Sequence, residues 1–247
     1  MPLDLTLFLA AAFLAALVAG VAGFAFGLVA AAVWLHVLTP LQTTTLIVAF
    51  GLIVQGYSVW KLRRALNLQR LLPFLIGGML GLPVGVALLR WLSPAHMKMA
   101  VGVLLILFSV YSLARPKVAR ITAGGRWADG GVGVLSGILG GTTGFGGILP
   151  TIWCTLRGWP KDEQRAVFQP TGVAIFLGTA LLLGGSGSVT VDTVRLFLIG
   201  LPALLAGSWL GLRLYGKLDE TAFRKIVLAL LLMSGLALVV PPVFGPA

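Results

Sequence analysis

The sequence predicts an all-α polytopic membrane protein with two inverted five-helix repeats, each opening with a glycine-rich membrane hairpin. Three observations lead to this prediction: the composition, the length of the apolar stretches and the placement of positive charge. Hydrophobic residues make up 58% of the 247 residues and charged residues 10%, and the mean hydropathy is +1.03. Since a soluble domain carries about 25% charged residues, this chain cannot cover itself with a polar surface.

Apolar stretches of membrane-spanning length recur along the chain. Residues 43–60, 71–90 and 97–114 each approach the roughly 20 residues that a helix needs to cross a bilayer. The first stretch, 3–20, has no positive segment before it and is followed by further spans. We therefore expect a membrane helix there rather than a cleaved signal peptide.

Positive charge is concentrated in a few short segments. The chain has 18 Lys and Arg residues against 7 Asp and Glu residues, and most of the cations fall in 61–70, 115–126, 157–165 and 213–225. Because positive loops stay on the cytoplasmic side of a membrane, we place these segments inside. We expect them to contact anionic lipid and not nucleic acid.

The first half of the predicted topology follows from this placement. The N-terminus and residues 36–42 carry no Lys or Arg, so both are expected outside. Residues 3–38 must then enter and return as a membrane hairpin bent near 20–27. The spans that follow, in alternating direction, are 43–60, 71–90 and 97–114. The first repeat is therefore 1–115, and a cytoplasmic linker follows at 116–126.

The second half has the same plan. Residues 127–157 begin and end inside, so they form a second hairpin, bent at 140–147. The spans that follow are 166–184, 197–212 and 226–240, which puts the C-terminus outside, like the N-terminus. We expect the whole protein to lie in the cell (inner) membrane. Each half has an odd number of helical segments, so the second repeat, 127–247, is expected to have the opposite orientation to the first.

Short matches between the halves support the repeat independently of charge. Gly20, Gly23 and Phe24 align with Gly141, Gly144 and Phe145, and Gly81 and Gly85 align with Gly207 and Gly211. The string FLIG also occurs in both halves, at 74–77 and at 197–200. Internal similarity combined with opposite orientation is typical of inverted-repeat transporters.

The bend of the second hairpin is rich in glycine and contains no charged residue. An arm of about 15 residues spans about 22 Å, less than the roughly 30 Å hydrocarbon core, so we expect the tip to stop inside the bilayer. Irregular backbone is tolerated there only inside protein or beside water, and N–H groups at a helix start can receive an anion. The alternative is that the glycines serve helix packing alone. A P-loop is excluded because no Gly-Lys-Ser/Thr is present.

Few other polar groups fall inside the predicted spans. Gln169 and Thr171 lie near the start of the helix after the second hairpin, and Thr43, Thr44 and Thr45 hold the comparable place in the first half. Gln55 is a weaker candidate. Amide and hydroxyl donors suit an oxyanion, although threonines can instead bond back to their own helix. The candidate substrate-binding residues are Gly20, Gly23, Phe24, Thr44, Thr45, Gly141, Thr142, Thr143, Gly144, Phe145, Gly146, Gly147, Gln169 and Thr171.

The reactive side chains argue against an enzyme or a metal carrier. All seven carboxylates, Asp129 among them, are placed at helix ends or in loops, with no nucleophile–base set and no metal-ligand cluster in sight. We expect no cofactor. Since no carboxylate is placed inside a span, we expect a uniporter or a substrate that carries its own proton. Cys154 is expected to pack as a small apolar residue, and Trp153 and Trp159 to pack or to lie at the membrane interface.

The chain resembles the sulfite exporter TauE/SafE family of transporters over roughly residues 5–240. The resemblance rests on the glycine-rich hairpin near the start of each half and on the phrases GVLSGILGGTTGFGGILPTIW and GWPKDEQRAVFQPTGVAIF. It implies a carrier of small sulfur-containing anions such as sulfite, sulfonates or thiosulfate. We expect the anion to bind between the two hairpin tips while the repeats alternate access. The alternatives are a carboxylate carrier on the same scaffold and a non-transporting membrane interaction protein.

Overall fold

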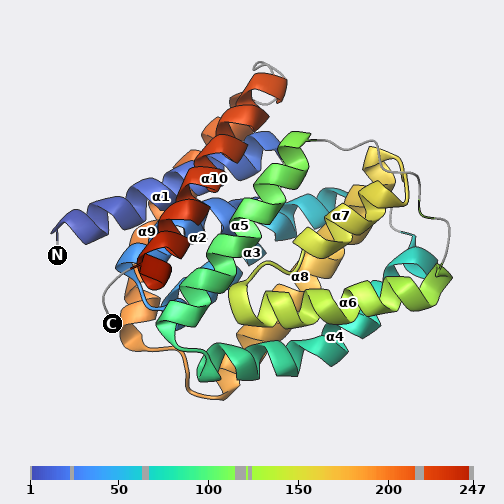
Figure 1. Cartoon of the computed structure of the whole chain (residues 1–247), viewed down its shortest axis with the longest axis horizontal. Helices are drawn as coiled ribbons and strands as arrows, with labels where there is room; N and C mark the ends of the chain where they lie inside the picture. Colours follow the sequence, from blue (N-terminus) through green and yellow to red (C-terminus); the bar gives the residue numbers. More distant parts are fainter. Residues whose placement is uncertain are drawn as a thin grey trace. The chain divides into compact units, whose positions relative to one another are not determined.

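The computed structural model describes residues 2–22, 25–62, 67–114, 121, 124–214 and 220–244, which form ten helices and no strand (Figure 1). In chain order the helices are α1 (Pro2–Ala22), α2 (Phe26–Val37), α3 (Pro40–Leu62), α4 (Leu68–Trp91), α5 (Pro94–Ala114), α6 (Gly125–Thr143), α7 (Ile148–Leu156), α8 (Lys161–Gly185), α9 (Val191–Leu214) and α10 (Glu220–Phe244). Among the described residues, α1, α4, α5, α8 and α9 are long and apolar enough to cross a membrane, and α2, α3 and α10 contain shorter apolar segments. The predicted all-α polytopic membrane fold is confirmed, and the inverted repeat stays a prediction.

Sequence signals at the helix starts explain several boundaries. Pro40 opens α3, where its fixed φ suits the first helical position. Thr39 and Gln42 form a capping box around it: Gln42 N donates to Thr39 Oγ1 at 3.2 Å, and Thr39 N donates to Gln42 Oε1 at 3.1 Å. Asn67 caps α4 by accepting a bond from Arg70 N at 3.3 Å.

The helices group into two compact units, each with helices from both halves of the sequence. The hairpin-1 unit consists of residues 1–43, 92–116 and 191–247, and the hairpin-2 unit of 44–91 and 117–190. Within the hairpin-1 unit, α1 packs along α9 and against α2, and α5 packs along α10. Within the hairpin-2 unit, α4 packs along α6 and against α8, and α7 contacts both α6 and α8 (Figure 1).

Small residues let α1 and α9 approach closely in the hairpin-1 unit. A Cβ placed on Gly211 would lie 3.0 Å from Gly20 Cα, and one placed on Gly207 would lie 3.0 Å from the Cβ of Ala16. Contact at this distance leaves no room for a larger side chain, as in other membrane helix pairs that meet at small residues.

Aromatic packing holds the two arms of the first hairpin together. The rings of Phe8 and Trp34 stack with centroids 5.1 Å apart, and the Trp34 indole N–H donates to Phe8 O at 3.1 Å. Phe26 meets the same tryptophan edge-on at 6.2 Å. Just before α2, Ala25 adopts φ 75°, a left-handed conformation that strains any residue with a Cβ.

α4 presents a small face and a large apolar face in the hairpin-2 unit. On the small face, a Cβ on Gly81 would lie 2.9 Å from Val134 C of α6, and one on Gly85 would lie 2.9 Å from Ile138 C. Exposed large apolar residues recur every four residues elsewhere on the helix, with exposed fractions of 40–69%: Leu72, Ile76, Leu80, Val84 and Leu88. α4 therefore packs on α6 through its glycines, and its larger apolar side chains stay exposed on another side of the helix.

Candidate functional site

The second hairpin reverses direction within four residues, Gly144 to Gly147. α6 ends at Thr143, and Gly144 adopts φ 79°, ψ 13° while its N–H donates to Gly140 O at 2.8 Å. Glycine enters this left-handed region without strain. α6 touches the bend directly, since a Cβ on Gly140 would lie 2.8 Å from Gly146 Cα.

α3 and α8 close around this bend. A Cβ on Gly144 would lie 2.6 Å from Ile47 Cγ2 of α3, and one on Gly146 would lie 2.8 Å from Ile175 Cγ2 of α8. Phe145, between the two glycines, is 3% exposed. The bend is therefore buried inside protein, the setting that irregular backbone at membrane depth requires.

The threonine hydroxyls at the site have acceptors within the protein. Thr142, Thr143 and Thr171 each donate to the carbonyl four residues earlier, at 2.7, 2.7 and 2.8 Å. Thr142 Oγ1 also lies 3.0 Å from Gly85 O of α4. Thr44 Oγ1 donates to Thr142 O at 3.1 Å, which ties α3 to the end of α6. Thr142, Thr143 and Thr171 therefore show back-bonding, the alternative role for the threonines, and Thr44 bonds to another helix.

The amide side chains lie on α3 and α8. Gln169 is buried on α8, with 3% of its surface exposed, and Thr45 on α3 is partly buried. A Cβ on Gly172 of α8 would lie 2.9 Å from Gln55 Oε1 and 3.8 Å from Gly147 Cα. The structure therefore brings Gln55, the weaker of the predicted amides, to the start of α7.

Two aligned glycines of the predicted site lie in helix–helix contacts. Gly20 packs on Gly211, and a Cβ on Gly141 would lie 2.9 Å from Val86 N of α4. Both positions fit the packing alternative for the glycines. Gly23 and Phe24, the other predicted residues of the first hairpin, lie outside the described residues.

Asp129 is placed more deeply than the sequence predicts. It lies in α6 and is only 5% exposed. The Trp153 indole N–H donates to Asp129 Oδ1 at 2.7 Å, and Arg157 Nη2 lies 4.0 Å from Asp129 Oδ2. One sequence signal could have predicted that Asp129 and Arg157 lie close together. Asp129 is the only acidic residue between 127 and 157, and Arg157 is the only Lys or Arg.

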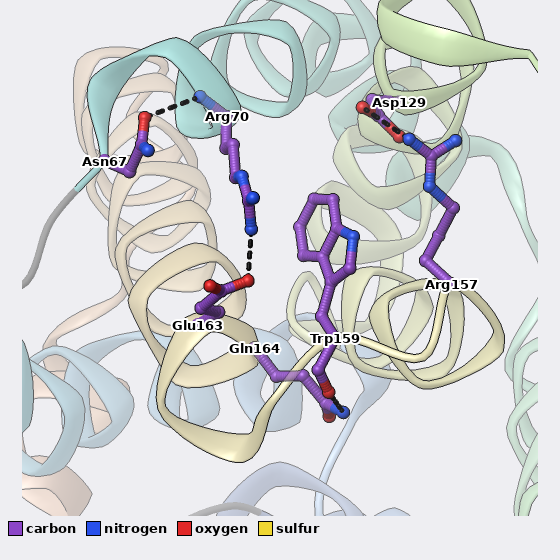
Figure 2. A network of polar contacts seen from close by, with 7 residues as sticks. All are labelled: Asn67, Arg70, Asp129, Arg157, Trp159, Glu163 and Gln164. Atoms are coloured by element: carbon purple, nitrogen blue, oxygen red, sulfur yellow. Dashed lines mark hydrogen bonds and ion pairs between the residues drawn. The ribbon is translucent and has the colours of Figure 1, made fainter. Parts of the chain in front are cut away.

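A cation–aromatic network continues from this pair (Figure 2). Arg157 Cζ lies 5.8 Å from the Trp159 ring centroid, and Arg70 Cζ lies 5.0 Å from it. Figure 2 shows the Trp159 indole between the two guanidinium groups, and Arg70 reaching the Glu163 carboxylate in an ion pair. The Gln164 amide donates to Trp159 O at 2.8 Å. The network joins the starts of α4 and α8 to the end of α7.

Cys154 packs as a small apolar residue, as predicted. It is fully buried in a core cluster with Phe74 and Val167, against which Trp153 and Trp159 also pack. Within the part of the chain that the structure describes, no three His, Cys, Asp or Glu side chains come together in a way that could hold a metal ion.

Comparison with known proteins identifies the family. No curated protein and no solved structure matches the chain significantly. A family model described as sulfite exporter TauE/SafE matches residues 8–238. This match covers most of the chain, so the chain belongs to the sulfite exporter TauE/SafE family of membrane transporters.

Proposed function

We propose that the protein is a secondary transporter of a small sulfur oxyanion or organosulfonate, and that the anion binds at the bend of the second hairpin. The family supports a membrane transporter of sulfite-like anions. The observation that carries the location is the buried, close-packed bend Gly144–Gly147, enclosed by Ile47 of α3 and Ile175 of α8. Charge-free, glycine-rich backbone inside a membrane protein is expected where a ligand approaches the main chain.

The threonine hydroxyls can serve an anion without leaving a carbonyl unpaired. Inside a helix each carbonyl accepts the N–H four residues later, so Leu139 O keeps a main-chain donor when the Thr143 hydroxyl turns away from it. The hydroxyl then donates to an anion oxygen in place of Leu139 O, from which it is 2.7 Å away at rest. Exchange of a back-bond for a charge-assisted bond favours the bound state.

Matched helix contacts support alternating access by two inverted repeats. Gly81 and Gly85 of α4 pack on α6, and the aligned Gly207 and Gly211 of α9 pack on α1. In each case the fourth helix of one repeat lies on the first hairpin arm of the other. The fifth helices meet at reciprocal glycines, because a Cβ on Gly102 would lie 2.8 Å from Gly235 O and the converse distance is also 2.8 Å. Such exchange and reciprocity are expected of structural repeats related by a two-fold axis.

Uptake into proteoliposomes tests the substrate class. Sulfite, thiosulfate, a short sulfonate and acetate are offered separately to the purified protein, and we expect uptake of sulfur anions in preference to acetate. Preference for acetate would replace the sulfur-anion proposal with a carboxylate carrier. No uptake of any of these anions, with correctly inserted protein, would favour a membrane interaction protein.

A matched pair of threonine variants tests the location. Thr143→Val removes a hydroxyl at the bend, and Thr179→Val removes an equally back-bonded hydroxyl of α8, 2.8 Å from Ile175 O. Loss of a hydrogen bond to a charged group weakens binding about 10- to 150-fold. We expect this weakening of sulfite binding, measured by calorimetry, for Thr143→Val and no change for Thr179→Val. Equal affinities of both variants and the parent would place the anion elsewhere.

A further inference from the structure

The base of the second hairpin contains a buried charge. The Asp129 carboxylate of α6 is 5% exposed and faces α7, from which it receives the Trp153 N–H at 2.7 Å and has the Arg157 guanidinium at 4.0 Å. Close by, the cluster of Phe74, Cys154 and Val167 is wholly apolar. We call Asp129, Trp153 and Arg157 the base clasp.

Stability alone does not explain a carboxylate in this position. Replacement of a buried ion pair by apolar residues of similar volume is often neutral or stabilising, and the clasp already lies beside an apolar core that could be extended. Buried ionic groups can instead fix one arrangement of the elements that hold them. The side-chain of Arg157 is 15% exposed and that of Asp129 7% exposed in this pair, so water screens the two charges little.

The clasp and the bend hold the hairpin at its two ends. Gly140, which touches Gly146 at the bend, follows Asp129 by eleven residues of α6, about 16 Å at the helical rise. On the other arm, α7 is only nine residues long. If the angle of α7 changes at the base clasp, this short helix therefore moves as a rigid body and displaces Gly144–Gly147 at its other end.

Contacts between guanidinium groups and tryptophan rings connect the base clasp to α4. Arg157 Cζ lies 5.8 Å from the rings of both Trp153 and Trp159, and Arg70 of α4 stacks on Trp159 at 5.0 Å (Figure 2). The Arg70–Glu163 pair at the rim is more than 40% exposed on both sides. An exposed ion pair contributes little to stability. The Arg70–Glu163 pair is therefore a suitable control for the buried pair of Asp129 and Arg157.

We infer that Asp129 is a positioning residue: by holding Trp153 and Arg157 it sets the angle of α7 and thereby the geometry of the bend at which the anion binds. The role in transport rests on the function proposed above. The role in holding the bend does not, and it can be measured without any anion.

Thiol labelling of the bend tests the inference. In a Cys154→Ala background, a cysteine at Thr143, which is 4% exposed, reports opening of the bend, and a cysteine at Thr179 of α8, which is 0% exposed, reports general loosening. We expect Asp129→Leu to raise the labelling rate at position 143 about tenfold or more, the effect of losing a hydrogen bond to a charged group, and to leave position 179 unchanged. Asp129→Asn keeps an acceptor for the Trp153 N–H, so its effect should be smaller. Asp129→Glu should restore protection, and Glu163→Gln should label like the parent.

Three results would overturn the inference. The first is an unchanged labelling rate at position 143 in both Asp129→Leu and Asp129→Asn. The second is an equal rise of the labelling rates at positions 143 and 179 in Asp129→Leu. The third is a rise at position 143 in Glu163→Gln as large as in Asp129→Leu. Sulfite uptake by Asp129→Leu supplies the functional readout: we expect KM to rise at least about tenfold, again from loss of one charge-assisted contact, and to rise less in Asp129→Asn. A parent that transports none of the offered anions would refute the proposed function and leave the labelling result intact.

Discussion

Gly144→Ala tests how tightly the bend of the second hairpin is constrained. At φ 79° alanine is strained by about 1–2 kcal/mol. Its methyl group would lie 2.6 Å from Ile47 Cγ2 and 3.2 Å from Ile47 Cβ, and overpacking of this kind costs about 1–3 kcal/mol. We therefore expect the free energy of unfolding to fall by about 2–5 kcal/mol, the sum of the two effects.

A double-mutant cycle separates the two contributions. Ile47→Ala alone leaves a cavity and costs about 2–5 kcal/mol. That cavity receives the new methyl group, so the double variant should be less destabilised than the sum of the single variants by about 1–3 kcal/mol. The backbone strain at Gly144 is unaffected by Ile47→Ala and should persist.

Unfolding in a denaturing detergent, followed by tryptophan fluorescence, provides the assay. Gly131→Ala is the matched control, because Gly131 lies in α6, the helix that ends at Gly144, has no positive φ and would place its Cβ at least 4 Å from other atoms. We expect that control to be stabilised by about 0.5–1 kcal/mol. Additive effects of Gly144→Ala and Ile47→Ala, within about 0.5 kcal/mol, would refute the contact between α3 and the bend.

Three further predictions use other parts of the molecule. Ala25→Gly should stabilise the protein by up to about 1.5 kcal/mol, because relief of a left-handed alanine, about 1–2 kcal/mol, exceeds the entropic cost of glycine, about 0.5–1 kcal/mol; a lower unfolding midpoint than the parent would contradict this. Gly81→Ala brings a methyl group within 2.9 Å of Val134 C and should lower the free energy of unfolding by about 1–3 kcal/mol, and an unchanged value would mean that α4 and α6 are not in close contact. In the Cys154→Ala background, a cysteine at Gln42 should react with an impermeant thiol reagent from outside intact cells. A cysteine at Gly124 should react only after the membrane is opened, as the positive-inside rule requires. The reverse pattern would invert the proposed topology.

Much of the fold can be predicted because local sequence decides it. The apolar runs predict the membrane helices, and the Thr39–Gln42 capping box and Pro40 mark the start of α3 within the flanking residues alone. The glycine-rich string 140–147 predicts the bend of the second hairpin, where glycine is needed for φ 79° at Gly144.

The rest depends on contacts between residues far apart in the chain. Asp129 has the sequence surroundings of an exposed helix start, and Trp153, 24 residues later, contributes to its burial. Likewise, Thr44 bonds to Thr142 across 98 residues, and no pattern within either segment indicates it. For the candidate site, sequence reasoning identifies the residue types, and tertiary packing decides which hydroxyls have protein acceptors.

The packing of α9 on α1 has a consequence for synthesis. Gly20 meets Gly211, so α1 has to wait for a partner that is synthesised 191 residues later, about 10–40 s at ordinary translation rates. Gly81 and Val134 are only 53 residues apart, about 3–10 s. A nascent chain arrested at residue 190 already holds every helix of the hairpin-2 unit, while α1 still has no α9 to pack on. During that interval the small face of α1 depends on lipid or on the insertion machinery, and mutations there should affect yield more than the activity of the molecules that mature.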